Sequence, residues 1–318
     1  MRWLIAHQPV ELFVRTATAF RNELNKRIPG QIDIEIITVP EYMKEHEGNE
    51  IGKILDYNTE EGKFESAVDA LFEALATDIQ ISQTQIITVA MKEPTFMALD
   101  LPFMFDDHEH CTRVVEGPIG QELLANLDRN TDVKGLAFTY SGGYRVIGSN
   151  EKIASLAELT GKKVIVSSTG ARADTLTSVG AEPVVVSPHI WGGWDKIPTD
   201  GTADAIETTY LRYVDGKYIY KTNHSMFMTT ILTNKSFWNS LTKEQQQAFE
   251  EAAVVTAAIE REWAIEDAEK YEENCAKKGI EITEMSAEDQ TVLTHKARYS
   301  YLKYSQDYGD LIKRIRLS

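Results

Sequence analysis

The chain has 318 residues, of which 42% are hydrophobic and 26% charged, so it is long enough to form two domains and to bury a full core. Acidic residues outnumber basic residues by 49 to 33, and the resulting net charge of −16 repels polyanions, which excludes nucleic acid as an expected partner. No uninterrupted apolar run is long enough to span a bilayer.

The N-terminal part of the chain alternates between strand and helix patterns. Residues 3–6 are expected to form a strand, and residues 10–28 an amphipathic helix that ends at Pro29-Gly30. A second strand over 32–39 completes one half of a βαβ unit. The patterns that follow are a polar, exposed excursion over 41–63, a helix over 64–76 and apolar stretches over 78–82 and 86–90.

A second group of strand and helix patterns begins near residue 135. A strand over 135–138 is expected to break at Ser141-Gly142-Gly143 and to resume over 144–148, with a crossover between two domains at the break. The alternation that follows predicts a second α/β domain. Its patterns are a strand over 163–167, a helix over 170–179, a strand over 183–186 and a helix-to-strand connection near 204–207.

The last third of the chain is mostly helical. One helix is expected to start at Thr242, with Gln245 three residues later as the second half of a capping box. It is expected to continue to about Lys278, where Gly279 ends it, and at about 1.5 Å per residue it would span both domains. Side chains at spacings of three or four predict its buried face, which consists of Phe249, Ala252, Thr256, Ile259 and Trp263.

Acidic and imidazole side chains cluster over residues 106–110. Both are metal ligands, but positions two apart on a helix face different directions, so His108 and His110 cannot readily share an ion. The acidic residues suit the first turn of a helix, where carboxylates meet unpaired N–H groups. We therefore expect a helix start there and no metal site.

Neither the spacing of the two cysteines nor any known catalytic motif indicates an enzyme. Cys111 and Cys275 lie far apart in sequence, so a disulfide stays open, although two unpaired thiols are favoured. Nucleophile-elbow, zinc-protease, phosphate-loop and dinucleotide-binding patterns do not occur. We expect no catalytic residue and no cofactor.

Six phrases, in this order, resemble the solute-binding proteins of TRAP (tripartite ATP-independent periplasmic) transporters. The resemblance implies an α/β, two-domain periplasmic-binding-protein fold with a long helix spanning both domains. It implies domain I over 1–140 and about 226–265, and domain II over 141–225 and about 266–318, with the ligand cleft between them. The phrases are Leu101–Phe105, Glu116–Leu124, Gly142–Arg145, Leu156–Val166, Ala173–Leu176 and Asp204–Glu207.

The resemblance also implies a function. A protein of this kind captures a small solute in the interdomain cleft as a monomer and delivers it to the membrane permease subunits of a TRAP transporter. It implies a periplasmic location and a removed leader, since residues 3–6 resemble the first strand of a mature domain. Two alternatives stay open, an enzyme on a similar bilobal scaffold and a binding protein of an ABC transporter.

One residue departs from the family pattern. In the family, the phrase at 156–166 ends Lys-Ile-Arg-Val, and its arginine forms paired hydrogen bonds to a bound carboxylate. Here that position is Ile165. The ligand is therefore either a small organic acid held by other cations or a non-carboxylate solute, such as a neutral, sulfonate or amine compound.

Two arginines are candidates for the missing cation. Taken alone, Arg145 after a glycine-rich turn is more typical of a surface residue, but the resemblance implies that it points into the cleft. A guanidinium group suits a planar anion because it offers a flat fork of donors. Arg172 either reaches the ligand or forms a structural salt bridge to Asp174 or another nearby carboxylate. Ser168 adds a hydroxyl donor at the same helix start.

The remaining candidates come from both predicted domains. Trp191 or Trp194 can stack on a flat or cationic ligand, with His189 as a weaker candidate. Glu207 matches a family glutamate, although Ala205 and Thr208 replace the glycine and asparagine that accompany it there. The further candidate ligand-binding residues are Tyr210 and Arg212 of the second domain, and His7, Gln8, Glu11 and Gln83 at strand ends of the first.

Overall fold

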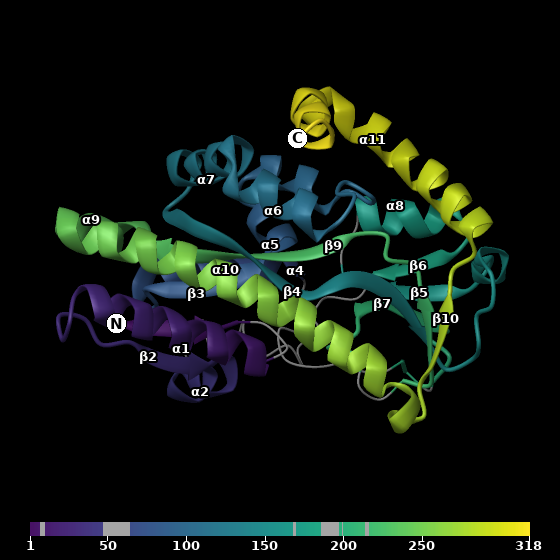
Figure 1. The fold of residues 1–318 in the computed structure, drawn as a ribbon, viewed down its shortest axis with the longest axis horizontal. Coiled ribbons are helices and arrows are strands. Elements are labelled where there is room, and N and C mark those ends of the chain that lie inside the picture. Colours follow the sequence, from purple (N-terminus) through teal and green to yellow (C-terminus); the bar gives the residue numbers. More distant parts are fainter. Residues whose placement is uncertain (7–9, 47–63, 168–169, 186–196, 199, 214–215) are drawn as a thin grey trace.

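The computed structural model describes residues 1–6, 10–46, 64–167, 170–185, 197–198, 200–213 and 216–318 (Figure 1). These residues form a ten-stranded mixed sheet with helices on both faces. None of the helices in these ranges combines the length and the hydropathy needed to cross a bilayer.

The sheet has two halves that share one long strand. In the first half β1, β2 and β3 run parallel, and β9 joins β3 to β4 in the antiparallel sense. In the second half β7 pairs with β4, β5 pairs with β7 and β6 closes the edge, while β8 and β10 form a side branch on β4. The strands are β1 (Arg2–Ile5), β2 (Glu35–Thr38), β3 (Ile81–Gln85), β4 (Val133–Ser149), β5 (Lys163–Val166), β6 (Glu182–Val185), β7 (Ala205–Thr209), β8 (Tyr218–Lys221), β9 (Met226–Asn234) and β10 (Glu281–Glu284).

The predicted break of this long strand at residues 141–143 is wrong. β4 is continuous over 17 residues, and its ladder to β9 slips between Tyr140 and Tyr144. Gly142 and Gly143 have φ of +85° and +76°, a backbone conformation that glycine adopts without a Cβ clash. The glycines therefore form a bulge rather than an end, and the strand passes from one half of the sheet to the other.

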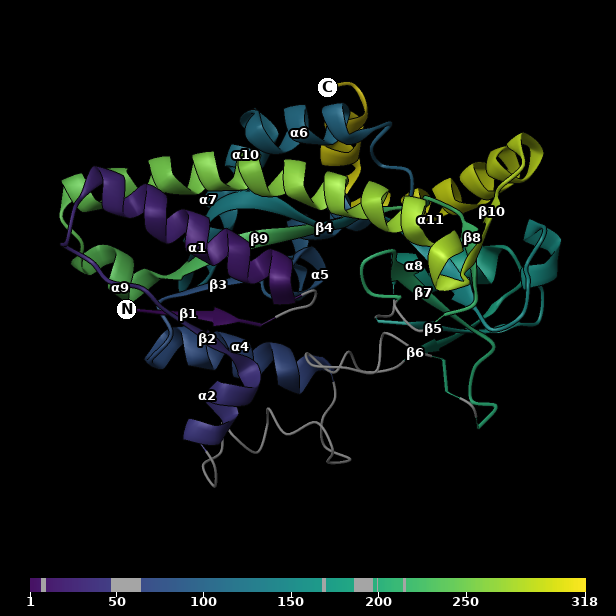
Figure 2. The same cartoon turned by 60° about the horizontal axis from the view of Figure 1, so that its bottom comes forward.

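The helices predicted over 10–28, 64–76 and 170–179 agree with α1, α4 and α8 to within one residue at each end. The second strand, expected over 32–39, is shorter than predicted: β2 starts at Glu35 and ends at Thr38, where α2 follows. α1 lies along α10 on one face of the sheet (Figures 1 and 2), and Trp3, Phe20 and Phe249 pack between them and the strands. The helical segments are α1 (Val10–Arg27), α2 (Val39–Glu45), α4 (Phe64–Thr77), α5 (Ile86–Ala90), η1 (Pro94–Asp100), α6 (His108–Glu116), α7 (Pro118–Asn130), η2 (Leu156–Leu159), α8 (Ala171–Ser178), α9 (Lys235–Ser240), α10 (Lys243–Asn274), η3 (Ala276–Lys278) and α11 (Ala287–Arg316).

The long helix α10 begins as predicted and ends at Asn274, four residues before the predicted end at Lys278. Thr242 and Gln245 form the capping box, and after a short 3-10 turn Gly279 adopts the left-handed conformation. Figure 1 shows α10 running past both halves of the sheet. Its buried face differs from the prediction, because Ile259 and Trp263 are only partly buried. Glu260 and Ala264 are buried instead, which keeps the stripe at the four-residue spacing of a helix face.

The acidic run at 106–110 starts α6, as predicted. The Asp107 side chain caps the helix by accepting a hydrogen bond of 2.7 Å from the N–H of His110. The His110 ring accepts from the N–H of Asp106 and donates to the carbonyl of Ile315 in α11. In the part of the chain that the structure describes, no three His, Cys, Asp or Glu side chains are placed to hold a metal ion.

Both cysteines are free and buried, in line with the favoured alternative. Cys111 Sγ lies 3.2 Å from Met228 Sδ, inside the core on the α6 side of the sheet. Burial raises the pKa of the Cys111 thiol to about 12, so this group is an inert part of the core.

Candidate functional site

A buried ionic network lies where β4 enters the second half of the sheet. Arg145 follows the glycine bulge, and its backbone N–H donates to the carbonyl of Ser225 at 2.9 Å. Its register partner on β7 is Thr209, so Glu207, two residues along that strand, projects from the same face. Nη1 of Arg145 donates to Oε2 of Glu207 at 3.1 Å, and the two side chains are 2% and 0% exposed.

Glu207 has a second partner. Nε2 of His224 lies 3.0 Å from Oε1 of Glu207, and Nδ1 of His224 lies 2.8 Å from Oγ1 of Thr222. Burial by itself raises the pKa of Glu207, but the charge of Arg145, the His224 hydrogen bond and the charge of Arg172 outweigh it and lower the pKa to about 2. Glu207 is therefore ionised and holds one edge of Arg145.

The other edge of Arg145 is open. Nε and Nη2 are buried, and neither has a hydrogen-bond partner among the residues that the structure describes. In a planar guanidinium group these two N–H donors point the same way, as a fork that fits a carboxylate. The guanidinium carbon lies 4.3 Å from the centroid of the Phe227 ring, which supports the flat group from one side.

Arg145 keeps its charge at neutral pH. Burial, together with the positive charge of Arg172, lowers its pKa, and the negative charges of Glu207 and Asp100 oppose this, so that the pKa is about 10. Two unused donors on a buried cation leave a hydrogen-bonding requirement that a bound anion meets.

Arg172, the other candidate cation, is fully engaged by protein groups. Its Nε and Nη2 donate to the two carboxylate oxygens of Asp100 at 2.9 and 2.6 Å, and Nη1 donates to Oγ of Ser167 at 2.5 Å. Burial opposes the charged form of Arg172, but Asp100 and Glu207 outweigh it and raise the pKa. Of the two roles left open for Arg172, the structure has the salt bridge, although Asp174 instead accepts from Lys303 at 2.8 Å.

Ile165 lies in an apolar environment. It pairs with Ile206 in the β5–β7 register, is 4% exposed, and belongs to a buried cluster that includes Val146 and Tyr210. Ile165 therefore contributes to the core of the second half. A role for Ile165 and Tyr210 in lining a ligand cleft stays a prediction.

Gln83 belongs to a different polar cluster. It is 1% exposed, and its Nε2 donates to Oγ1 of Thr139 at 2.8 Å and to Oε1 of Glu260 in α10 at 3.4 Å. The N–H of Tyr140 donates to Oε2 of Glu260 at 2.7 Å. Burial raises the pKa of Glu260 to about 8. No described contact joins Gln83 to the Arg145 network.

Glu11 lies at the exposed start of α1, beside a cavity of about 320 Å³ between α1 and α10. Arg15 and Asp267 form an ion pair at the same place. No described contact links Glu11 with Arg145. The predictions that lie outside the described residues concern His7, Gln8, Ser168, His189, Trp191 and Trp194.

Sequence reasoning missed the two side chains that complete the network. His224 stands in an Asn-His-Ser phrase, and a histidine two residues after a threonine carries no signal of its role. Asp100 directly precedes the phrase at 101–105 and was not singled out. Both act through contacts with residues distant in sequence, so pattern alone cannot find them.

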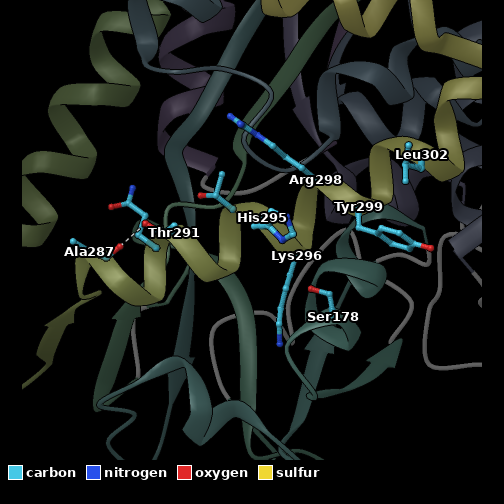
Figure 3. A pocket seen from close by; sticks show the side chains of 10 residues that line it. Ser178, Ala287, Thr291, His295, Lys296, Arg298, Tyr299 and Leu302 are labelled. Atoms are coloured by element: carbon cyan, nitrogen blue, oxygen red, sulfur yellow. Dashed lines mark hydrogen bonds between the residues drawn. The ribbon is translucent and has the colours of Figure 1, made fainter.

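A larger hollow lies elsewhere on the surface. A groove of about 1050 Å³ lies between α11 and α8. Figure 3 shows Ser178 on one side of it and Lys296 and Tyr299 on the other. Tyr299 and Leu302 are 74% and 64% exposed. This groove contains none of the buried ionic groups described above, so it is not the place where the Arg145 network would take a ligand.

The family profile of "Bacterial extracellular solute-binding protein, family 7" matches residues 7–307. The chain therefore belongs to the bacterial extracellular solute-binding proteins of family 7. The resemblance to TRAP solute-binding proteins and the periplasmic location it implies are confirmed.

Relatives of known sequence include an uncharacterized protein of Haemophilus influenzae, 26% identical over 70% of this chain and 69% of its own. The 2,3-diketo-L-gulonate-binding periplasmic protein YiaO of Escherichia coli is 24% identical over 70% and 69% of the two chains. The C4-dicarboxylate-binding periplasmic protein DctP of Rhodobacter capsulatus is 24% identical over 61% and 59%.

Solved structures share the fold. A TRAP periplasmic solute-binding protein from Xanthobacter autotrophicus with bound β-D-galacturonate superimposes with a TM-score of 0.80, at 22% identity over 100% of this chain and 99% of that chain. One from Shewanella oneidensis with bound succinate has a TM-score of 0.79, at 17% identity over 100% and 98%. The predicted α/β, two-domain binding-protein fold with a long helix is confirmed.

Proposed function

We propose that this protein captures a small organic anion on the open edge of Arg145 and delivers it unchanged to the permease subunits of a TRAP transporter. The observation that carries the proposal is the pair of buried donors, Nε and Nη2, which no described residue accepts from, beside an edge already held by Glu207. In the proposed complex the ligand lies between a domain of 1–140 with about 226–265 and a domain of 141–225 with about 266–318, in a monomer.

A carboxylate is the anion that fits best. Its two oxygens accept from the two parallel donors at once, and a charge-assisted pair of this kind is stronger than two neutral hydrogen bonds. Arg145 would then provide the bidentate contact that the family obtains from the position of Ile165. The two parallel donors of Arg145 therefore favour an acid over the neutral and amine solutes that the sequence alone leaves open.

The relatives agree with an acid as ligand. The similar proteins include ones named for binding 2,3-diketo-L-gulonate and C4-dicarboxylates, and the similar structures hold galacturonate, glucuronate and succinate. Closure of two lobes over such a ligand would be driven by its tighter binding to the closed state.

A thermal-shift and calorimetric screen tests the proposal. The ligands are D-galacturonate, D-glucuronate, pantoate and succinate, with D-galactose and ethanolamine as neutral and cationic controls. A bound acid at a hundred times its dissociation constant should stabilise the protein by about 2.7 kcal/mol. Mass spectrometry of the released ligand should recover it unchanged. Binding of only the neutral or cationic control, or a converted product in excess of the protein, would reject the proposal.

Delivery to the permease has its own test. Membrane vesicles that contain the permease subunits should take up the radiolabelled acid when the loaded protein is added. Vesicles without the permease serve as the control. Equal uptake by both kinds of vesicle would contradict delivery while leaving capture intact.

A further inference from the structure

Arg145 and Arg172, the two buried arginines of the network, differ in whether their Nε–H and Nη2–H donors have hydrogen-bond acceptors. The equivalent fork, Nε with Nη2, has no partner on Arg145 within the described ranges of the chain and is filled on Arg172 by the carboxylate of Asp100. We infer that Asp100 takes the position of a second ligand carboxylate, so that the site selects a monocarboxylate over a dicarboxylate. This inference rests on the proposed function and adds the charge of the ligand to it.

The Asp100–Arg172 pair has the geometry of a bound ligand carboxylate. Both oxygens of Asp100 accept, at 2.6 and 2.9 Å, and the two side chains are 4% and 2% exposed. Asp100 ends η1 in the first half of the molecule, whereas Arg172 belongs to α8 in the second half. The protein therefore provides from one half the carboxylate that an arginine of the other half requires.

The two arginines belong to one electrostatic network. The charge of Arg172 lowers the pKa of Arg145, and both arginines lower the pKa of Glu207. An anion that binds to Arg145 therefore enters the field of Asp100 and Glu207 as well. Any second negative group on that ligand meets the same field.

The charges of the network explain the selectivity. Arg145 and Arg172 carry two positive charges, and Glu207 and Asp100 two negative charges. A first ligand carboxylate can accept hydrogen bonds from Nε–H and Nη2–H of Arg145. A second carboxylate near Asp100 finds the fork of Arg172 already filled, and it would be desolvated near the like charges of Asp100 and Glu207. Burial of an unpaired charge is costly, so a second carboxylate weakens binding.

The similar structures hold both classes of acid. Galacturonate and glucuronate carry one carboxylate, and succinate carries two. Likeness of fold does not choose between these classes, since the TM-scores are nearly equal at 0.80, 0.81 and 0.79. The pairing of Asp100 with Arg172 favours the first class for this chain.

Matched ligands test the inference on the unmodified protein. Calorimetry compares three pairs in which a carboxamide replaces one carboxylate, namely the monoamide of D-galactarate with D-galactarate, the monoamide of D-glucarate with D-glucarate, and succinamate with succinate. In the pair that binds best, the dicarboxylate should bind at least about tenfold more weakly, as expected for one unsatisfied charged group. A dicarboxylate that binds as tightly as its partner or tighter overturns the inference and leaves the proposed function intact. If no acid binds, the proposed function itself fails.

Two variants test the role of Asp100. Asp100→Asn removes the charge that fills the fork of Arg172, and it should shift the ratio of the two affinities toward the dicarboxylate by about tenfold. Asp174→Asn is the matched control, because Asp174 also accepts from a cation but contacts Lys303 rather than Arg172. An unchanged ratio in a folded Asp100→Asn protein contradicts the inference. If this variant does not fold, the ligand pairs on the unmodified protein still decide the question.

Discussion

Replacement of Arg145 by lysine separates the contribution of the two fork donors, Nε–H and Nη2–H, from the contribution of the positive charge. Lysine keeps a positive group beside Glu207, so the buried carboxylate retains a counter-charge and the fold is expected to persist. An ammonium group cannot present two parallel donors on one edge while another donor holds Glu207. The variant therefore removes the bidentate contact to the ligand and little else.

The expected loss follows from the contacts. The open edge of Arg145 offers two charge-assisted hydrogen bonds, each worth about 1.5–3 kcal/mol, and a lysine recovers at most one of them. The net loss is about 1.5–3 kcal/mol, which corresponds to a roughly ten- to hundredfold weaker affinity for the acid. Truncation to alanine should cost more, about 2–5 kcal/mol, because Glu207 also loses its partner.

Isothermal titration calorimetry with the tightest acid of the screen measures the effect. Circular dichroism and urea unfolding establish that the variant is folded. Arg113→Lys is the control, because Arg113 is exposed and pairs only with Glu109 on the same helix among the described residues. An affinity of Arg145→Lys equal to that of the parent, in a folded protein, would remove the open edge of Arg145 from the binding site.

Three further predictions concern buried groups. Glu207 has a folded-state pKa of about 2, below its ordinary value, so the stability that it contributes is present above about pH 4.5 and is lost on acidification toward pH 2. Urea unfolding should show that Glu207→Gln is less stable than the parent by about 3–5 kcal/mol at pH 7. The difference between the two proteins should shrink as the pH falls from about 4.5 to 2. Glu260 has a raised pKa of about 8, so the parent should lose stability as the pH rises from about 4.5 to 8. Glu260→Gln should lack this slope and exceed the parent at pH 8 by up to about 5 kcal/mol, whereas an equal slope in both proteins would show that Glu260 ionises normally. Ile165→Arg inserts a cation among Val146 and Ile206, and thermal unfolding should report a loss of at least about 4 kcal/mol; a stable variant would mean that residue 165 reaches solvent or a ligand.

Local sequence determined the elements whose hydrogen bonds close within one turn. Thr242 and Gln245 cap α10, Gly279 ends the turn that follows it, and Asp107 caps α6, each as its pattern predicts. These contacts join residues a few positions apart, so they need no knowledge of the rest of the chain. The order of the family phrases likewise predicted the fold class and selected Arg145.

The tertiary structure decided everything that depends on distant partners. Glycines at 142 and 143 end a strand in one context and bulge it in another, and here β9 on the neighbouring ladder keeps β4 continuous. Arg172 and Asp100 lie 72 positions apart, and the sequence alone does not predict which carboxylate pairs with Arg172. A buried charge takes the partner that the packed fold brings within hydrogen-bonding distance. That packing, rather than any local pattern, leaves the fork of Arg145 open and fills that of Arg172.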